Sequence, residues 1–152
     1  MPVDYESIYG KDSIVFTKTN PTWGKLSNFY GNVEHKFQAE KYPDDPEHQK
    51  AILNADTPAK AKRMGGKRGG KPLTEEQIKE WNQKRVDVMK KLVAGKCSDG
   101  NEYATLLLST GLNQIVEKAP WDSFWGAGRN GKGQNILGKI LMQRRQELIW
   151  KM

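Results

Sequence analysis

A carboxylate and an amine that could act together stand at Glu34 and Lys41, seven residues apart. In a helix, residues i and i+7 lie on the same face, two turns apart. His35 and Gln38 lie near that face as well. A carboxylate and an amine that face one pocket are the minimum set for general acid–base chemistry. The alternative is an ordinary surface pair, which spacing alone favours.

A second candidate is the glycine-rich segment 125–138, which holds five glycines together with Trp125, Arg129 and Lys132. Glycine lets the backbone approach a ligand closely, at an entropic cost on folding. The segment ends where an amphipathic helical pattern begins, so its amides could point at an anion from a helix N-terminus. The Trp125 indole could stack on a base or a sugar. The alternative is a plain surface turn, which would not need the tryptophan or the basic residues. The glycines do not follow a buried strand, which excludes a dinucleotide-binding fingerprint.

Two further residues allow both a functional and a structural interpretation. Asp122 lies three residues before Trp125 and could serve chemistry or cap a turn. Trp81 lies on the apolar stripe of a long predicted helix, where packing in the core is the ordinary role.

The chain has 152 residues and a formal net charge of +7, from 25 basic and 18 acidic residues. A basic balance favours partners that carry phosphate. The run from Lys60 to Lys71 concentrates this charge without an acidic residue and could follow a nucleic-acid backbone. The alternative is a solvated, lysine-rich surface that keeps the protein soluble.

Several classes of protein are excluded or disfavoured by composition. One cysteine, Cys97, excludes an internal disulfide, and with two histidines a zinc site is improbable. We therefore expect no metal and no cofactor. No apolar run is long enough to cross a bilayer, and Met1 to Gly10 lacks the apolar core of a signal peptide. We expect a cytoplasmic protein that does not bind a membrane.

The expected fold is mainly α, a single compact domain over residues 1–152 with a small N-terminal β element. A strand is predicted at 13–18 and two short extended pieces around Pro120, within 114–124. Thr57-Pro58 and the capping box that starts at Thr74 mark two helix starts. Helices are predicted at 33–42, 47–54, from 58 to a stop at Gly65-Gly66, from 75 to about 94 with Gly95 as the stop, at 101–110, and at the C-terminus with Leu137, Ile140, Leu141 and Leu148 on one face.

An ordered set of segments resembles the YbiA/NADAR family of N-glycosidases. The matching pieces are GKLSNF at 24–29, EHKFQAEK at 34–41, PAKAKRMG at 58–65, Trp81 with Lys84 and Val88-Met89, LLLSTG at 106–111, DSFWG at 122–126, and the glycine loop through Leu137-Gly138. They run from about residue 13 to residue 149 in the order of the family, and the ordered set is specific where each piece alone is not.

The resemblance implies hydrolysis of a bond between C1 of a ribose phosphate and an exocyclic amino nitrogen. It implies two substrate classes: ADP-ribose on the amino group of guanine in nucleic acid, and ribosylamino-pyrimidine phosphates of riboflavin biosynthesis. We expect the first, because the chain has Ala127 where YbiA-like chains often carry Asp, and because of the basic run. A non-catalytic module that binds ADP-ribose or nucleic acid is the remaining alternative.

The chemistry of a glycosylamine allows two routes. Ring opening gives an imine, and Lys41 could capture C1 as a Schiff base while Glu34 moves protons. Alternatively, Glu34 could assist direct attack by water. The resemblance places functional roles on Glu34, Trp81, Asp122 and Trp125. Our expected catalytic residues are Glu34, Lys41 and Asp122.

The expected substrate-binding residues combine the glycine loop with the family's motifs. Phosphates are expected at Arg63, Arg129 and Lys132 and at the amides of Gly131 and Gly133. The resemblance implies as partners an ADP-ribose or ribose-phosphate N-glycoside, ADP-ribosylated DNA or RNA, and an ADP-ribosyltransferase toxin as functional counterpart. The full expected binding set is Ser27, Asn28, His35, Arg63, Trp81, Trp125, Gly126, Gly128, Arg129, Gly131, Lys132, Gly133 and Asn135.

Overall fold

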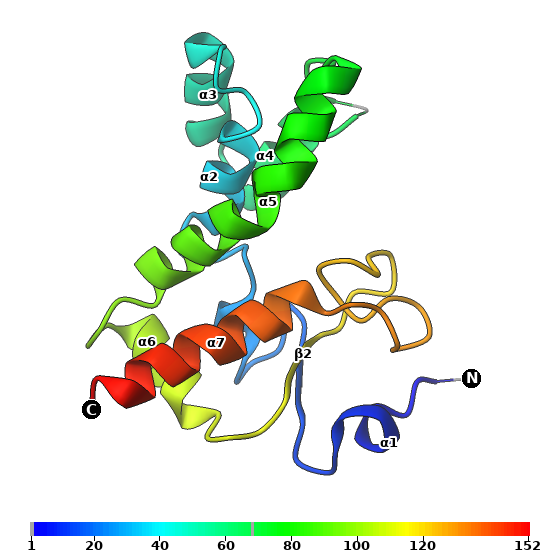
Figure 1. Cartoon of the computed structure of the whole chain (residues 1–152), viewed down its shortest axis with the longest axis vertical. Helices are drawn as coiled ribbons and strands as arrows, with labels where there is room; N and C mark the ends of the chain where they lie inside the picture. Colours follow the sequence, from blue (N-terminus) through cyan, green and yellow to red (C-terminus); the bar gives the residue numbers. More distant parts are fainter. Residues whose placement is uncertain (1, 68) are drawn as a thin grey trace. The chain divides into compact units, whose positions relative to one another are not determined.

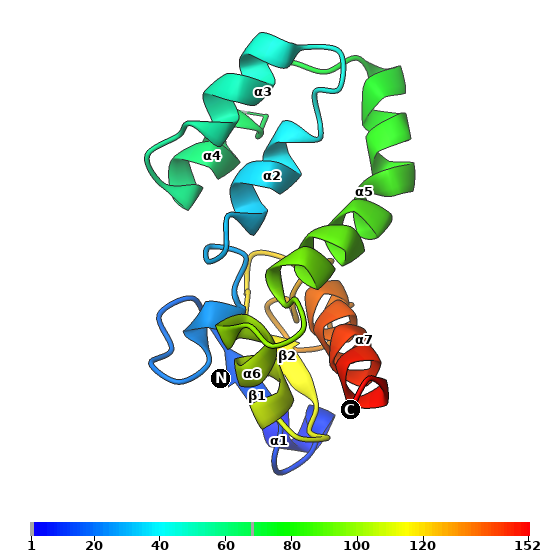
Figure 2. The same ribbon diagram turned by 90° about the vertical axis from the view of Figure 1, so that its left-hand side faces the viewer.

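The computed structural model describes residues 2–67 and 69–152 and is predominantly helical, with one small sheet (Figures 1 and 2). The prediction of a mainly α fold with a small β element is confirmed. The described residues fall into two compact units, one made of 28–92 and the other of 2–27 together with 93–152. The prediction that all of them form one domain stays a prediction. None of the helices within the described ranges is long and apolar enough to span a bilayer.

The unit of residues 28–92 is built from short helices around a small apolar core. The helix α2 packs on both α3 and α4, and these two pack on each other (Figure 1). The rings of Phe37 and Trp81, 4.9 Å apart, join α2 to α5. The buried core next to them consists of Ala39, Tyr42, Ile52 and Ala61. The helices are α2 (Val33–Ala39), α3 (Pro46–Leu53), α4 (Pro58–Met64) and α5 (Glu75–Lys96), whose last residues belong to the other unit.

Side-chain caps fix where these helices begin. Asp45 and Thr57 each accept a hydrogen bond from the backbone N–H three residues later, and a proline follows each of them at the first helical position. Thr74 and Gln77 form the predicted capping box: the Thr74 hydroxyl accepts from the Gln77 N–H at 3.1 Å, and Gln77 Oε1 accepts from the Thr74 N–H at 2.9 Å. The predicted helix starts are therefore confirmed.

The other unit contains the sheet. Strand β1 (Ile14–Phe16) pairs in parallel with β2 (Ile115–Glu117), so the predicted N-terminal strand finds its partner far along the chain. Helices α6 (Glu102–Ser109) and α7 (Ile136–Trp150) pack on each other, and α7 packs on β2 (Figure 2). The predicted apolar face of α7 is buried. Two short elements were not predicted, α1 (Tyr5–Tyr9) and the 3₁₀ helix η1 (Gly24–Leu26).

Two predicted helix ends and one predicted extended piece were wrong. The helix expected at 33–42 ends at Ala39, because Pro43 disfavours helical backbone at the preceding residue, and Lys41 lies in the following turn. Helix α5 continues through Gly95 to Lys96, since one glycine costs only about 1 kcal/mol in a helix and the buried Val93 and Cys97 outweigh it. The extended piece expected after Pro120 is a turn.

Candidate active site

The carboxyl group of Glu34 is buried, which excludes the interpretation of an ordinary surface pair. Of the side chains of α2, only that of Lys36 is exposed, and Glu34 is 7% exposed. The amide of Gln38, one turn later, donates a hydrogen bond from Nε2 to Glu34 Oε1 at 2.7 Å. The backbone N–H of Glu34 donates to the carbonyl of Asn28 at 3.0 Å, which fixes the start of the helix.

Burial raises the pKa of the Glu34 carboxyl above its ordinary value, because the charged form loses hydration. The hydrogen bond from Gln38 opposes this rise, and so do the positive charges of Lys62 and Lys41. Since burial has the larger effect, the site favours the protonated form more than water does.

Lys41 is half-buried and its ammonium group is fixed. Its Nζ donates a hydrogen bond to the backbone carbonyl of Gly65 at 3.0 Å, at the C-terminal end of α4. Burial lowers the pKa of Lys41, and the positive charges of Lys62 and Arg85 lower it further, whereas Glu34 opposes the shift. Lys41 therefore loses its proton to give the neutral amine more easily than a solvated lysine does.

These two shifts suit one chemistry. A neutral amine is a nucleophile toward an imine carbon, and a carboxyl group whose pKa is raised keeps the proton that a general acid donates up to a higher pH. Helix α2 supplies the carboxyl group and the turn after it supplies the amine, so both lie within residues 28–92. Glu34 and Lys41, which the spacing in the sequence pairs, thus influence each other's pKa in the structure.

Two buried polar atoms next to this pair have no hydrogen-bond partner among the described residues. They are His35 Nδ1 and Gln38 Oε1. The other ring nitrogen of His35, Nε2, lies 3.0 Å from the carbonyl oxygen of Ala55. An unpaired buried acceptor or donor is costly and rare in a folded protein, so two of them beside Glu34 set this part of α2 apart from an ordinary core.

Trp81 has an evident packing role. It is 7% exposed, and its ring is tilted against that of Phe37, which lies three residues after Glu34 on α2. Lys84 Nζ lies 5.9 Å from the centre of the indole. The structural interpretation of Trp81 as a core residue therefore accounts for its position, and its role in binding stays a prediction.

The amides of Gly131 and Gly133, expected to bind phosphate, donate hydrogen bonds within the loop, so their role in phosphate binding stays a prediction. The N–H of Gly133 donates to the carbonyl of Ala127 at 2.6 Å, and that of Gly131 donates to Gly128 at 3.3 Å. At the start of α7, the N–H groups of Ile136 and Leu137 donate to the carbonyls of Phe124 and Trp125, each at 3.0 Å. The other phosphate candidates in this loop, the side chains of Arg129 and Lys132, are exposed.

Asn135 and Asp122 both have structural tasks. The buried Asn135 side chain donates to the carbonyl of Ile115 at 2.9 Å and accepts from the N–H of Glu117 at 3.0 Å, which ties the loop to β2. Asp122 Oδ1 accepts from the N–H groups of Phe124 and Trp125, both at 2.9 Å. These contacts account for both residues without a ligand.

The other residues of the loop are placed by close packing. Trp125 is half-buried and its ring meets that of Phe124 edge-on, with the ring centres 4.9 Å apart. A Cβ on Gly126 would lie 2.6 Å from that of Ala119, so only glycine fits there. Gly128 adopts a φ of +70°, which favours glycine as well.

Ser27 and Arg63 lie in different environments. Ser27 is buried, and its carbonyl accepts a hydrogen bond from Lys96 Nζ at 2.8 Å. Burial lowers the pKa of Lys96 to about 8. Arg63 is exposed on α4, as are Lys60 and Lys62. The basic run is thus solvated over these residues, while Arg68 lies outside the described residues.

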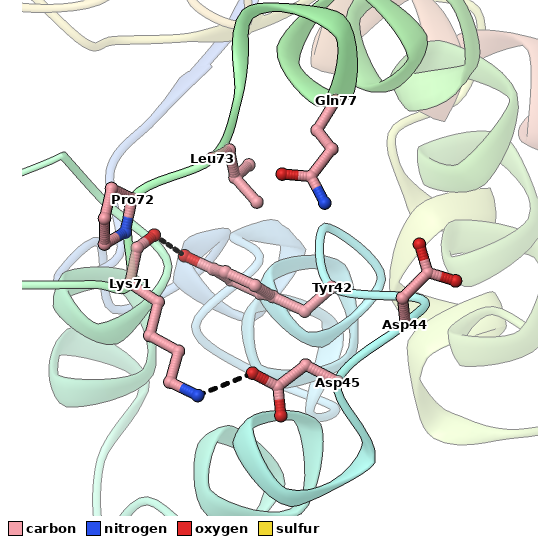
Figure 3. A pocket seen from close by; sticks show the side chains of 7 residues that line it. All are labelled: Tyr42, Asp44, Asp45, Lys71, Pro72, Leu73 and Gln77. Carbon is pink, nitrogen blue, oxygen red and sulfur yellow. Dashed lines mark hydrogen bonds and ion pairs between the residues drawn. The ribbon is translucent and has the colours of Figure 1, made fainter.

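A hollow of about 140 Å³ lies elsewhere in the unit of residues 28–92 (Figure 3). Leu73 and Gln77 point toward Tyr42, whose hydroxyl donates to the carbonyl of Lys71 at 2.8 Å. Lys71 is in turn paired with Asp45 at 2.7 Å. No predicted site residue lines this hollow, so we do not identify it with the active site. Its lining is Tyr42, Asp44, Asp45, Lys71, Pro72, Leu73 and Gln77.

The expected catalytic and binding residues are divided between the two units. Glu34, Lys41, His35 and Trp81 belong to the unit of residues 28–92, whereas the glycine loop belongs to the other. A shared pocket with Trp125 therefore stays a prediction. Sequence reasoning placed Gln38 near the face of Glu34 without giving it a role, and it did not select Gly65, Arg85 or Lys96. The spacing of four residues between Glu34 and Gln38 was a usable signal.

Comparisons with known proteins agree on one family. The model of the NADAR domain matches residues 9–149. N-glycosidase YbiA of Shigella flexneri is 36% identical, with 97% of this chain and 98% of the relative covered. The Riboflavin biosynthesis protein PYRR of Zea mays is 34% identical over 94% of this chain, which spans 26% of that protein. The NMR structure of the E. coli protein YbiA is 33% identical with a TM-score of 0.76, covering 99% of this chain and 95% of that one.

Proposed function

Since the chain belongs to the NADAR domain family, we propose that it is an N-glycosidase that hydrolyses the bond between ribose C1 and an exocyclic amino nitrogen. The observation that carries this proposal is the buried Glu34 carboxyl beside the half-buried Lys41 amine, with both pKa values displaced toward the neutral forms. The name N-glycosidase of the full-length relative supports the reaction class.

In the proposed mechanism, the furanose ring opens and the exocyclic nitrogen becomes an imine at C1. The lone pair of neutral Lys41 attacks C1, so a carbon–nitrogen bond to Lys41 forms while the original one breaks. Glu34 supplies the proton with which the amine leaves. Water then hydrolyses the lysine imine, which returns free Lys41 and the sugar aldehyde.

Direct attack by water is the alternative route. Glu34 would then act as general base, or its carboxylate would stabilise an oxocarbenium-like state. In that route Lys41 would be a fixed cation. The lowered pKa of Lys41 favours the imine route, because a group that acts only as a cation gains nothing from burial.

For the substrate we rank ribosylamino-pyrimidine phosphates first, which reverses the ranking drawn from the sequence. The name of the maize relative places a protein that contains this type of chain in riboflavin biosynthesis. Ala127, which argued against this substrate, is fully buried and its N–H donates to Glu117. The exchange of Asp for Ala at position 127 therefore affects the packing of the loop and does not argue against this substrate.

ADP-ribose on guanine is the second substrate. The observation that favours it is the exposed basic face of α4, with Lys60, Lys62 and Arg63. The positive charge of Lys62 is near enough to lower the pKa of both Glu34 and Lys41. A polyanionic substrate would find its counter-charge next to the reacting groups.

The test is a side-by-side turnover assay of both substrates, with chromatography of the released base and sugar. Release from at least one substrate is expected, and the faster reaction identifies the substrate class. If the protein binds ADP-ribose or oligonucleotide and releases product from neither substrate, it is a binding module and the enzyme proposal is wrong.

A further inference from the structure

The amide of Gln38 is placed so that it can meet both protonation states of Glu34. Its Nε2 donates to Glu34 Oε1 at 2.7 Å, which suits a carboxylate. Its Oε1 is buried and has no hydrogen-bond partner among the described residues. The amide N–H group is therefore hydrogen-bonded, whereas the amide oxygen is available to accept a hydrogen bond.

A carboxylate only accepts hydrogen bonds, whereas a carboxylic acid also donates one. The Gln38 amide holds both complementary groups, and rotation about its last bond exchanges them. With N–H toward Glu34 it pairs the anion, and with Oε1 toward Glu34 it accepts the proton of the acid. A partner that held only one of these groups would match only one of the two states of the Glu34 carboxyl group.

Gly65 makes room for this amide. A Cβ at position 65 would collide with Oε1, Cβ and Cδ of Gln38. Gly65 has an ordinary φ of −94°, so the close approach and not the backbone conformation requires glycine. The carbonyl of the same residue accepts from Lys41 Nζ, so Gly65 contacts the partners of both reacting groups.

We propose that Gln38 is a positioning residue that holds Glu34 in both its charged and its neutral form by rotation of its amide, within the space left by Gly65. The consequence for the reaction rests on the proposed function: Glu34 gives and takes a proton in each turnover, and Gln38 keeps it in place at both stages. The other titratable groups whose electrostatic effect reaches Glu34 are Lys62 on α4, Lys41 in the turn after α2 and His35 on the same helix.

The test needs no substrate, so its failure is distinguishable from failure of the proposed function. Gln38→Met removes both the donor and the acceptor group with a side chain of nearly the same size. The free energy of unfolding in urea is measured below and above the Glu34 titration, whose midpoint is found by NMR of carboxyl-labelled protein. A partner of both states loses stability equally at the two pH values, and the unfolded fraction rises about tenfold at each, the ordinary worth of a hydrogen bond.

A donor that serves only the carboxylate gives a different result. The loss would then appear only above the titration and the pKa of Glu34 would rise, which overturns the proposal. Gln49→Met is the matched control, because Gln49 donates to the carbonyl of Ala39 and does not contact Glu34. Its loss of stability also leaves the Glu34 midpoint in place, so the readout that separates the two residues is the side-chain amide NMR signal of the wild type. The signal of Gln38 changes through the Glu34 titration as the amide rotates, and that of Gln49 does not. An unchanged Gln38 signal overturns the proposal.

Gly65→Ala provides a second, independent variant if Gln38→Met fails to fold. The added Cβ displaces the Gln38 amide, so the stability loss again appears at both pH values. Gly66→Ala is its control, since a Cβ there meets only backbone oxygens at 3.3 Å or more. If Gly65→Ala behaves like Gly66→Ala, the space at Gly65 does not serve Gln38 and the proposal is wrong.

Discussion

Lys41 Nζ donates a hydrogen bond to the backbone carbonyl of Gly65 at 3.0 Å. An amine can make this bond whether it is charged or neutral, because both forms carry N–H groups. The contact therefore orients Nζ without forcing it to stay protonated. A lysine held in this way can present its lone pair in a constant direction once the proton has left.

We predict that Lys41 forms a Schiff base during turnover. Reduction with borohydride should trap the sugar phosphate on the peptide that contains Lys41, detected by mass spectrometry. Lys41→Arg should abolish turnover, because guanidinium keeps its proton and offers no lone pair. Lys36→Arg is the control, since Lys36 is exposed on α2, and it should stay active. An active Lys41→Arg variant without any adduct would favour direct attack by water.

Glu34→Gln should retain binding but slow turnover by roughly 10²–10⁴-fold, the usual contribution of a general acid or base. The paired measurements are substrate affinity and single-turnover rate. Glu40→Gln is a suitable control, since Glu40 is exposed at the end of α2. A variant that loses affinity and keeps its rate would show that Glu34 serves binding alone.

The same Glu34→Gln variant should gain stability at neutral pH. Burial raises the pKa of Glu34 in the folded state, so stability falls as pH rises from the ordinary carboxyl value through the folded one. Glutamine has no charge to bury, so this loss disappears. The difference in free energy of unfolding between variant and wild type should therefore grow from acid to neutral pH. A constant difference would contradict the raised pKa.

Much of the fold could be predicted because it depends on local signals. The caps at Thr57 and Thr74 identify two helix starts, and the recurrence of apolar residues at helical spacing identifies most helices. Glu34 and Lys41 were also found from helical spacing, although Lys41 lies just beyond the helix. The turn after α2 keeps Lys41 close enough to Glu34 for the two charges to interact, so the pairing holds although the predicted helix end was wrong.

The rest depends on contacts between distant segments. The pairing of β1 with β2 and the hold of Asn135 on β2 join residues that no local pattern relates. The sequence of the glycine loop does not reveal that the amides of Gly131 and Gly133 donate to carbonyls of the same loop. Burial of Glu34 also follows only from packing of α2 on α3 and α4.

Asp122 allows a test that separates a cap from a catalytic group. Asp122→Asn keeps an oxygen that can accept from the N–H groups of Phe124 and Trp125, whereas Asp122→Ala removes it. If the residue is a cap, Asp122→Asn should remain active, and Asp122→Ala should lose about 1 kcal/mol of stability, the usual cost of a lost cap. Urea unfolding and turnover are measured for both. A stable but inactive Asp122→Asn variant would restore Asp122 as a catalytic residue.

Lys62→Met should move the pH dependence of kcat/KM to higher pH. The positive charge of Lys62 lowers the pKa of both Glu34 and Lys41. Removing it raises both values, so a rising limb set by neutral Lys41 and a falling limb set by Glu34 shift in the same direction. High salt should produce a similar shift in the wild type and little in the variant, because it screens the same exposed charge.

The control for this variant is Lys60→Met, on the same helix. Lys60 is also exposed and lies 4.0 Å from Asp56, but it does not contribute to the shifts of Glu34 or Lys41. Both substitutions are at solvated positions, where stability usually changes by less than about 0.5 kcal/mol. A profile that moves equally in both variants would mean that the net charge of the protein, and not the position of Lys62, controls the two reacting groups.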